Sequence, residues 1–158
     1  MNSVNRAWRA VSSLGLILTL LAVFDAVANA DNTRVAQIKT VAGQAEIVRS
    51  GVRTVARVGD LLYEKDTIET GPDGSIGMTF IDNTVMSSGP DSQIVLEDYK
   101  FNSSNFKGSM LADMNRGTVS MISGDIARSS PGAMKVKTPT AILGVRGTRF
   151  VIEVKDNR

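Results

Sequence analysis

The chain of 158 residues contains no cysteine and no histidine. These two absences exclude disulfides, thiolate nucleophiles, zinc fingers, haem attachment sites and a Ser-His-Asp triad. Aromatic residues are few, at 5%, and neither sign of charge prevails, because 18 basic residues stand against 16 acidic ones. Such a balance does not indicate a nucleic-acid-binding protein. We therefore expect no nucleic-acid partner. The groups left for catalysis are carboxylates, lysines, hydroxyls and metals bound through oxygen.

A long apolar run is also missing. The longest one, 11–24, has about 14 residues and is too short to cross the ~30 Å hydrocarbon core of a bilayer comfortably. Arg6 and Arg9 precede it, and Ala28-Asn29-Ala30 follows it with alanine at both positions that signal peptidase inspects. The arrangement is typical of a secretory signal, and the alternative is an uncleaved N-terminal membrane helix.

The predicted domain organisation is therefore a signal peptide helix over residues 1–30 and a single domain over residues 31–158. Cleavage after Ala30 would release a periplasmic or secreted protein that meets the membrane only transiently, through its signal peptide. Without cysteine, that domain has to be stable outside the cytoplasm with no disulfide.

Alternation of apolar and polar residues with period two recurs after residue 31, whereas no window keeps the helical period of 3.6 residues over three turns. The pattern predicts short strands, and the best candidates are Val35–Val41, Ala45–Arg49, 76–80, 118–122, 134–137 and 150–154. Residues 99–108 are polar apart from two aromatics, and we expect a long loop or an edge hairpin there.

Glycine, proline, aspartate and asparagine separate these candidates at short and nearly regular intervals, as turns between strands do. The fold class is therefore predicted as all-β, either a small solenoid-like or a sandwich-like domain. A weak internal repeat favours the solenoid, because Gly-Pro-Asp occurs at 71–73 and again at 89–91. Two copies are few for a repeat array, so both architectures stay open.

Pairs of carboxylates are the commonest route to hydrolysis without histidine, and the sequence contains two candidate pairs. Glu97 and Asp98 are adjacent, so on a strand they point to opposite faces. Glu64 and Asp66 would share a face, and we interpret them as a solvated charged face of a strand edge. We therefore expect no enzyme activity and no cofactor or metal.

Basic residues gather in the last quarter of the chain, at Lys135, Lys137, Arg146 and Arg149. Ordinary solvation of a strand accounts for the two lysines, and a weak docking patch for an anion or a partner is the functional alternative.

Residues 137–150 contain two glycines that bracket Val145 and Arg146 just before a predicted strand. We expect a tight turn in which Gly144 and Gly147 adopt backbone angles closed to other residues. Arg146 would project from that corner and either pair with a carboxylate or cap carbonyl groups.

The same stretch closely resembles the Thr-Pro-x-Ala-x-x-Gly-Val-Arg-Gly-Thr-x-Phe signature of FecR domains. The matching residues are Thr138, Pro139, Ala141, Gly144, Val145, Arg146, Gly147, Thr148 and Phe150. The resemblance extends upstream to shorter elements that include Gly59 and Asp60, Thr70 and Gly74, Asp82, Gly89 and Pro90, and Gly117. It covers roughly residues 35–154.

The resemblance implies an all-β, solenoid-like domain outside the cytoplasm without known catalysis. In the iron-uptake system that gave the family its name, the regulator links an outer-membrane transporter to a cytoplasmic sigma factor through a cytoplasmic N-terminal domain and a membrane helix. Thirty residues before the domain leave no room for a sigma-binding segment, so we do not carry that role over.

The sequence leaves two predicted functions open. The first is a protein-interaction or signalling accessory module in the bacterial envelope whose partner is another envelope protein, bound at an exposed strand edge or at the corner around Arg146. The alternative is a cell-wall or polysaccharide-binding module with an aromatic platform formed by Tyr99, Phe101 and Phe106.

Overall fold

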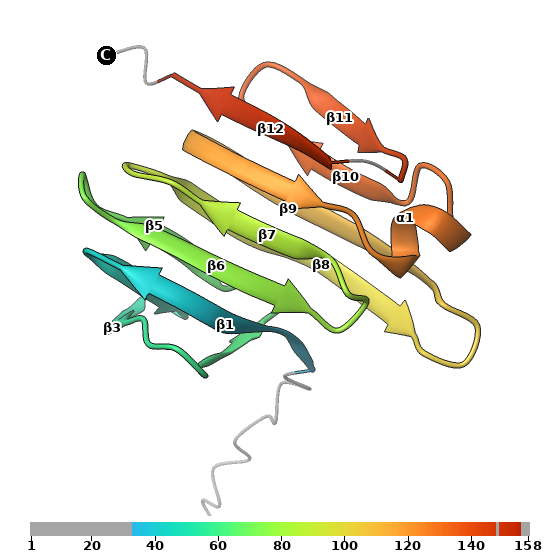
Figure 1. Ribbon diagram of the computed structural model, residues 1–158, viewed down its shortest axis with the longest axis horizontal. Coiled ribbons are helices and arrows are strands. Elements are labelled where there is room, and N and C mark those ends of the chain that lie inside the picture. The colour runs from blue at the N-terminus through green and yellow to red at the C-terminus, as the bar shows by residue number, and fades with distance from the viewer. Residues whose placement is uncertain (1–32, 148, 156–158) are drawn as a thin grey trace, which may run out of the picture. The chain divides into compact units, whose positions relative to one another are not determined.

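The computed structural model describes residues 33–147 and 149–155. The predicted signal peptide, with Ala28 and Ala30, lies outside these residues, as does Thr148. The described part contains twelve strands and one short helix (Figure 1). In chain order they are β1 (Arg34–Ala42), β2 (Ala45–Arg49), β3 (Val52–Val55), β4 (Leu61–Tyr63), β5 (Thr67–Thr70), β6 (Ser75–Phe80), β7 (Val85–Ser88), β8 (Gln93–Asn102), β9 (Lys107–Ile122), α1 (Asp125–Ser129), β10 (Met134–Lys137), β11 (Ile142–Val145) and β12 (Arg149–Val154).

The predicted all-β class is confirmed, and the alternation of residues accounts for the strands. In β10, Met134 and Val136 are buried while Lys135 and Lys137 are exposed. Of the two expectations for residues 99–108, the edge hairpin is confirmed and the long loop is wrong. Residues 99–102 of β8 pair with 107–110 of β9, while β5 pairs with β8 only at 93–95, so among the described residues no strand lies beside this end of β8.

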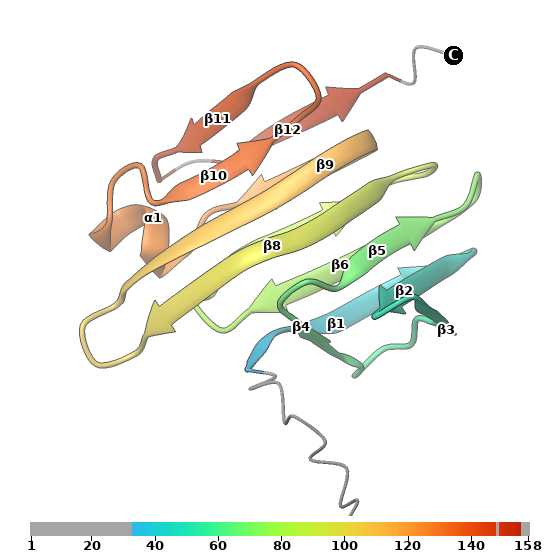
Figure 2. The same ribbon diagram turned by 180° about the vertical axis from the view of Figure 1, so that it is seen from behind.

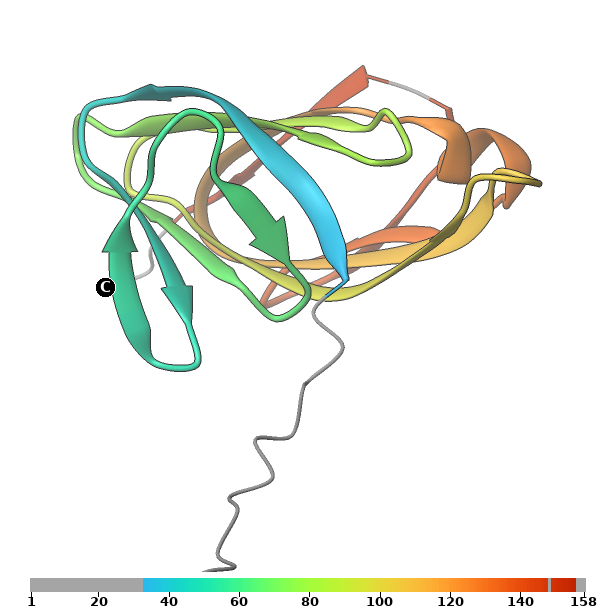
Figure 3. The ribbon, with the colours of Figure 1, turned by 90° about the horizontal axis from the view of Figure 1, so that it is seen from below.

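All twelve strands belong to one sheet that is folded into two layers, as Figure 3 shows. The first layer contains β4, β1, β6, β7, the C-terminal part of β9 and β12, in that order. The second layer contains β3, β2, β5, β8, the N-terminal part of β9, β10 and β11. Since β9 pairs with strands of both layers, it joins them.

Four of the points at which the chain crosses between the layers lie side by side, along the left of Figure 1. We call residues 43–44, 70–74, 89–92 and 116–118 the crossover row. Backbone hydrogen bonds connect neighbouring crossings: the Gly71 amide donates to the Gln44 carbonyl (2.9 Å), the Asp91 amide to the Gly71 carbonyl (3.0 Å), and the Gly89 amide to the Thr118 carbonyl (2.9 Å). These hydrogen bonds connect the crossings where the sheet bends from one layer into the other.

The topology decides between the two architectures left open by the sequence. A solenoid stacks its coils in parallel, but here only β9 and β10 pair in parallel and the other strand pairs of the described residues are antiparallel. The domain is therefore a curled half-barrel sheet whose two layers face each other, and not a solenoid. The two Gly-Pro-Asp segments are neighbouring crossings of opposite direction, from β5 to β6 and from β7 to β8, rather than successive coils.

The core lies between the two layers and is formed by aliphatic side chains and methionine. Every methionine after Met1 is buried, at positions 78, 86, 110, 114, 121 and 134. Flexible thioether side chains fill the irregular space that a bent sheet leaves between its layers. Phe80 of the first layer stacks on Tyr99 of the second, with ring centroids 5.6 Å apart. The core thus contacts both layers without a second domain among the described residues.

Candidate functional site

The residues that resemble the FecR motif fall into distinct places in the fold. Thr70, Gly74, Gly89, Pro90 and Gly117 belong to the crossover row. Asp82 lies in the turn between β6 and β7, and Gly59 and Asp60 precede β4. The remaining described ones form or flank β10, β11 and β12: Thr138, Pro139, Gly144, Val145, Arg146, Gly147 and Phe150.

In the crossover row, Thr70 and Ser92 tie two crossings together below the surface. The Thr70 hydroxyl donates to the Gly89 carbonyl (2.7 Å) and accepts from the Ser92 amide (2.9 Å). The Ser92 hydroxyl in turn accepts from the Thr118 amide (3.0 Å). Both side chains are almost completely buried. Their hydroxyls satisfy backbone groups that the bend removes from the strand ladders, so their role is structural.

Glycine is required in this row because the backbones approach closely. A Cβ at Gly117, whose φ is +92°, would lie 2.1 Å from the Ser92 hydroxyl oxygen, and one at Gly74 would lie 2.0 Å from the Gln44 carbonyl oxygen. No side chain fits at such distances, and Gly117 also occupies the left-handed region. This part of the motif therefore specifies how the sheet bends.

Asp82 closes the opposite side of the two-layered sheet. Its fully buried carboxylate accepts hydrogen bonds from the Tyr99 hydroxyl (3.0 Å) and from the Thr84 hydroxyl (2.8 Å). It also accepts from the backbone amide of Ile126 at the start of α1 (3.3 Å). The network joins the β6–β7 turn of one layer to β8 of the other and to the helix. Burial, followed by the charge of Asp82, raises the pKa of Tyr99.

The prediction of an aromatic platform for carbohydrate binding is wrong. Tyr99 is buried against Phe80 and hydrogen-bonds to Asp82, and Phe101 is half-buried on the same strand. Of the three residues, Phe106 is exposed, in the turn between β8 and β9. Alternation along β8 turns Tyr99 and Phe101 inward together, away from any ligand in solution.

The C-terminal part of the motif is built differently from the crossover row. Gly147 has a φ of +55°, which confirms its predicted left-handed angle, but the expectation for Gly144 was wrong because Gly144 pairs with Lys135 as an ordinary residue of β11. A Cβ at either glycine would meet nothing within 4 Å. The hydroxyl of Thr138 accepts from the Ala141 amide (3.0 Å) and shapes the turn between β10 and β11.

Arg146 follows β11 at the surface. Among residues 33–147 and 149–155 it has no hydrogen-bonding or carboxylate partner, so the predicted pairing is not found there. Val145 next to it is buried, and the half-buried Phe150 packs against the core from β12. The tight turn thus anchors itself through Val145 and Phe150 and presents Arg146 to solvent.

Of the four carboxylates considered for catalysis, Asp66, Glu97 and Asp98 are engaged in structural contacts. Asp66 is fully buried rather than solvated, and Arg49 binds both its oxygens, at 2.7 and 2.8 Å. Glu97 pairs with Lys65 (2.8 Å), and Asp98 accepts from the Ser109 hydroxyl (2.8 Å). An acid–base pair with a free proton-transferring group does not arise from these residues.

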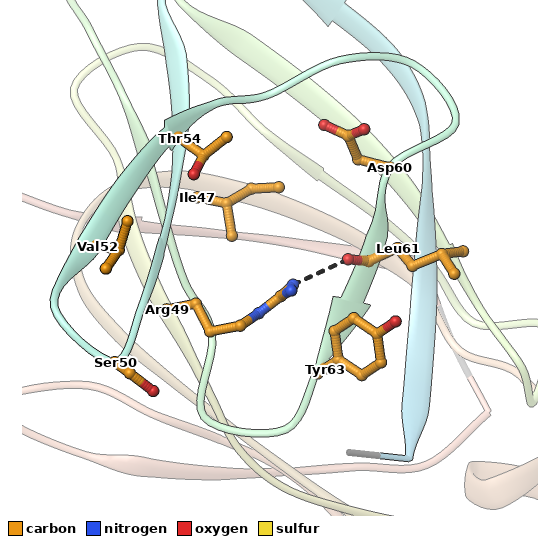
Figure 4. A pocket seen from close by; sticks show the side chains of 8 residues that line it. All are labelled: Ile47, Arg49, Ser50, Val52, Thr54, Asp60, Leu61 and Tyr63. Atoms are coloured by element: carbon orange, nitrogen blue, oxygen red, sulfur yellow. Dashed lines mark hydrogen bonds between the residues drawn. The ribbon is translucent and has the colours of Figure 1, made fainter. Parts of the chain in front are cut away.

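A pocket of about 530 Å³ lies between the β2–β3 hairpin and β4 (Figure 4). Arg49 occupies its wall, 4.3 Å from the centroid of the Tyr63 ring, and donates to the Leu61 carbonyl (3.0 Å). The hydrogen bond to Asp66 raises the pKa of Arg49. Since the guanidinium is already held by Asp66 and Leu61, it clamps the hairpin onto the sheet. This clamp could not be predicted from the sequence, because no local pattern marks Arg49 as the partner of Asp66.

Asp60 borders the same pocket and fixes the turn before β4. Its carboxylate accepts from the Arg57 amide (2.9 Å), and the Gly59 amide donates to the Ile38 carbonyl of β1 (2.9 Å). Within the described ranges, no group of acidic residues is placed to hold a metal ion, and no helix is long and apolar enough to cross a membrane.

The FecR protein family model matches residues 66–158, which is more than half of the chain. The chain therefore belongs to the FecR family, whose members are regulatory and signalling proteins and generally not enzymes. The match includes the crossover row from Thr70 onward, the Asp82 turn and the whole C-terminal motif. Neither the curated proteins nor the solved structures include a significant match to this chain.

Proposed function

We propose that this chain is an exported, non-catalytic FecR domain that binds another protein of the bacterial envelope and serves as an accessory module in signalling. Support comes from three sides: the signal sequence predicted over residues 1–30, membership of a signalling family, and the structural contacts that engage Asp66, Glu97 and Asp98. Export places the domain in the periplasm or outside the cell.

The observation that carries the proposal is the exposure of apolar side chains on the strands that contain the C-terminal motif. The crossover row uses its motif residues to bend the sheet, but Ile142 and Val151 are apolar, lie on β11 and β12, and are each 65% exposed. Both strands are the last of their layers, and no other described strand pairs with their outer edges, where another chain can add a strand. Contact with a partner would explain why the strands that contain the C-terminal motif lie exposed at the surface.

The proposal is tested in living cells by photo-crosslinking. A benzophenone amino acid is placed at position 151 in β12 or at position 52 in β3, since Val151 and Val52 are equally exposed, at 65%. We expect the mature protein to begin at Asp31 in the periplasmic fraction and to form a specific crosslink to an envelope protein. A folded protein that stays in the cytoplasm, or one that crosslinks to no protein from either position, would contradict the proposal.

A further inference from the structure

The two layers of the sheet differ in width at the C-terminal end. Beyond β9, the second layer continues with β10 and then β11, whereas the first layer continues with β12 alone. At the other end the layers match, because β4 follows β1 in one layer and β3 follows β2 in the other. The first layer is therefore one strand short beside β12, where Figure 2 shows β11 outermost.

Side chains that face the interior are left partly uncovered at this position. Leu143 pairs with the buried Val136 and so faces the core side of β11, yet it is 40% exposed. On the first layer, Phe150 and Ile152 face inward from β12 but are only half-buried. Interior residues nearer the middle of the sheet, such as Ile94, are almost completely buried. A strand added beside β12 would cover Leu143 and complete the burial of β12.

The charge around this position is mainly positive. Residues 134–155 contain five basic residues and one acidic residue, Glu153. Lys137 pairs with Asp113 (2.6 Å), but Arg146 and Lys155, which flank β12, are exposed and have no ion-pair partner among the described residues. Acidic groups at both ends of an added strand would meet these cations, while a second copy of this chain would bring the same positive charges together.

We propose that the outer edge of β12, with which no described strand pairs, receives one extended segment of a partner protein, with apolar side chains at alternate positions and acidic residues at both ends. The segment pairs its backbone with β12, covers Leu143 from the first layer and places its carboxylates near Arg146 and Lys155. The apolar contacts and the backbone pairing provide affinity, and the charges select the partner. This inference rests on the proposed function, because it names the surface and the kind of partner for the same binding activity.

A synthetic peptide tests the proposal directly. The probe is acetyl-Glu-Glu-Val-Thr-Val-Thr-Val-Glu-Glu-amide, and binding is followed by amide chemical shifts of the purified protein. We expect the largest shifts in β12, and binding weaker by about tenfold or more when lysine replaces every glutamate or proline replaces the central valine.

Two double variants provide matched controls. Arg146→Glu with Lys155→Glu should weaken binding of the probe by about tenfold or more, while Lys39→Glu with Arg57→Glu, the same charge change at exposed positions far from β12 in the sheet, should leave it unchanged. Equal binding of the glutamate and lysine peptides, shifts that map to β3 or β4, or no binding at all would overturn the inference. So would a dimer, detected by sedimentation, that buries β12.

The failure of this inference differs from the failure of the proposed function. A crosslink to an envelope protein from position 52 but not from position 151, with no binding of the probe, leaves the function standing and removes β12 as its site. Absence of any crosslink removes the function itself.

Discussion

The crossover row and the C-terminal end both contain glycines of the FecR motif, but only the first uses them for packing. A Cβ at Gly117 or Gly74 would collide with neighbouring atoms at about 2 Å, whereas a Cβ at Gly144 or Gly147 would project into open space. Close approach of backbones thus explains one half of the motif and leaves the other half at the surface. The difference indicates that a single family signature serves both to bend the sheet and to shape an exposed edge.

Valine in place of individual glycines of the two regions tests this difference, because only the glycines of the crossover row should be required for packing. Gly117→Val should lower the free energy of unfolding by about 3–5 kcal/mol, since overpacking against Ser92 adds to the cost of a left-handed angle for a β-branched residue. Urea unfolding followed by far-ultraviolet circular dichroism measures the loss. If this variant does not fold, Gly117→Ala provides a milder test in the same direction. A stability equal to that of the wild type would refute the assigned role of the crossover row.

The side of the two-layered sheet opposite the crossover row should be sensitive to a single hydroxyl. Tyr99→Phe removes the donor to Asp82 and leaves buried polar groups short of a partner, so we expect a loss of about 1–3 kcal/mol at neutral pH. Thermal unfolding measures it, with Tyr63→Phe, at the pocket beside Arg49, as the control for removal of a tyrosine hydroxyl.

The same residue gives the domain a predicted pH dependence. Because the pKa of Tyr99 is raised in the folded protein, its contribution is complete below the ordinary tyrosine pKa of about 10 and declines as the pH rises above it. Tyr99→Phe should flatten this alkaline decline. Absorbance near 295 nm in a Tyr63→Phe background reports Tyr99 alone, since the chain has two tyrosines, and it should show ionisation only together with unfolding. Ionisation in the intact fold would contradict the buried position of Tyr99.

Gly147→Val should have a smaller effect, a loss of about 1–2 kcal/mol. The cost arises only from the φ of +55°, because no neighbouring atom opposes the new side chain. Gly147→Asn serves as the control, since asparagine tolerates this region better than valine does. Equal stability of the valine and asparagine variants would show that the turn adopts another backbone angle.

Gly144→Val should change stability least, within about 0.5 kcal/mol of the wild type, because the residue lies in a strand with open space around it. Chemical denaturation of the pair Gly144→Val and Gly117→Val gives the direct comparison. A large loss at Gly144 would mean that the C-terminal glycines also serve packing, and the contrast between the two regions would disappear.

The sequence was sufficient for the fold class and most strands because those depend on local alternation. Met134 and Val136, for example, are buried as their spacing from Lys135 and Lys137 predicts. The way in which the strands form two layers could not be predicted from the sequence. The two Gly-Pro-Asp turns look the same whether they join successive coils of a solenoid or form neighbouring crossings of opposite direction. The orientation of Tyr99 was misjudged for a related reason: polar neighbours hid its inward direction.

Long-range side-chain contacts were the least predictable part of the candidate site. Asp66 was interpreted as a solvated carboxylate, because the partner that makes its burial possible, Arg49, lies 17 residues away at the end of β2. The basic bias of the last quarter was visible in the sequence, but its significance depends on β12 being the last strand of the narrower layer, which only the topology reveals.

The position of β9 in both layers has a consequence for the order of assembly. This strand of 16 residues pairs with β7, β8, β10 and β12, and therefore neither layer is complete without it. A nascent chain that ends before residue 107 leaves β7 and β8 with bare edges, although two thirds of the protein has been synthesised. Productive folding consequently waits for a late segment, and until that segment emerges the chain depends on whatever protects unpaired strands from aggregation.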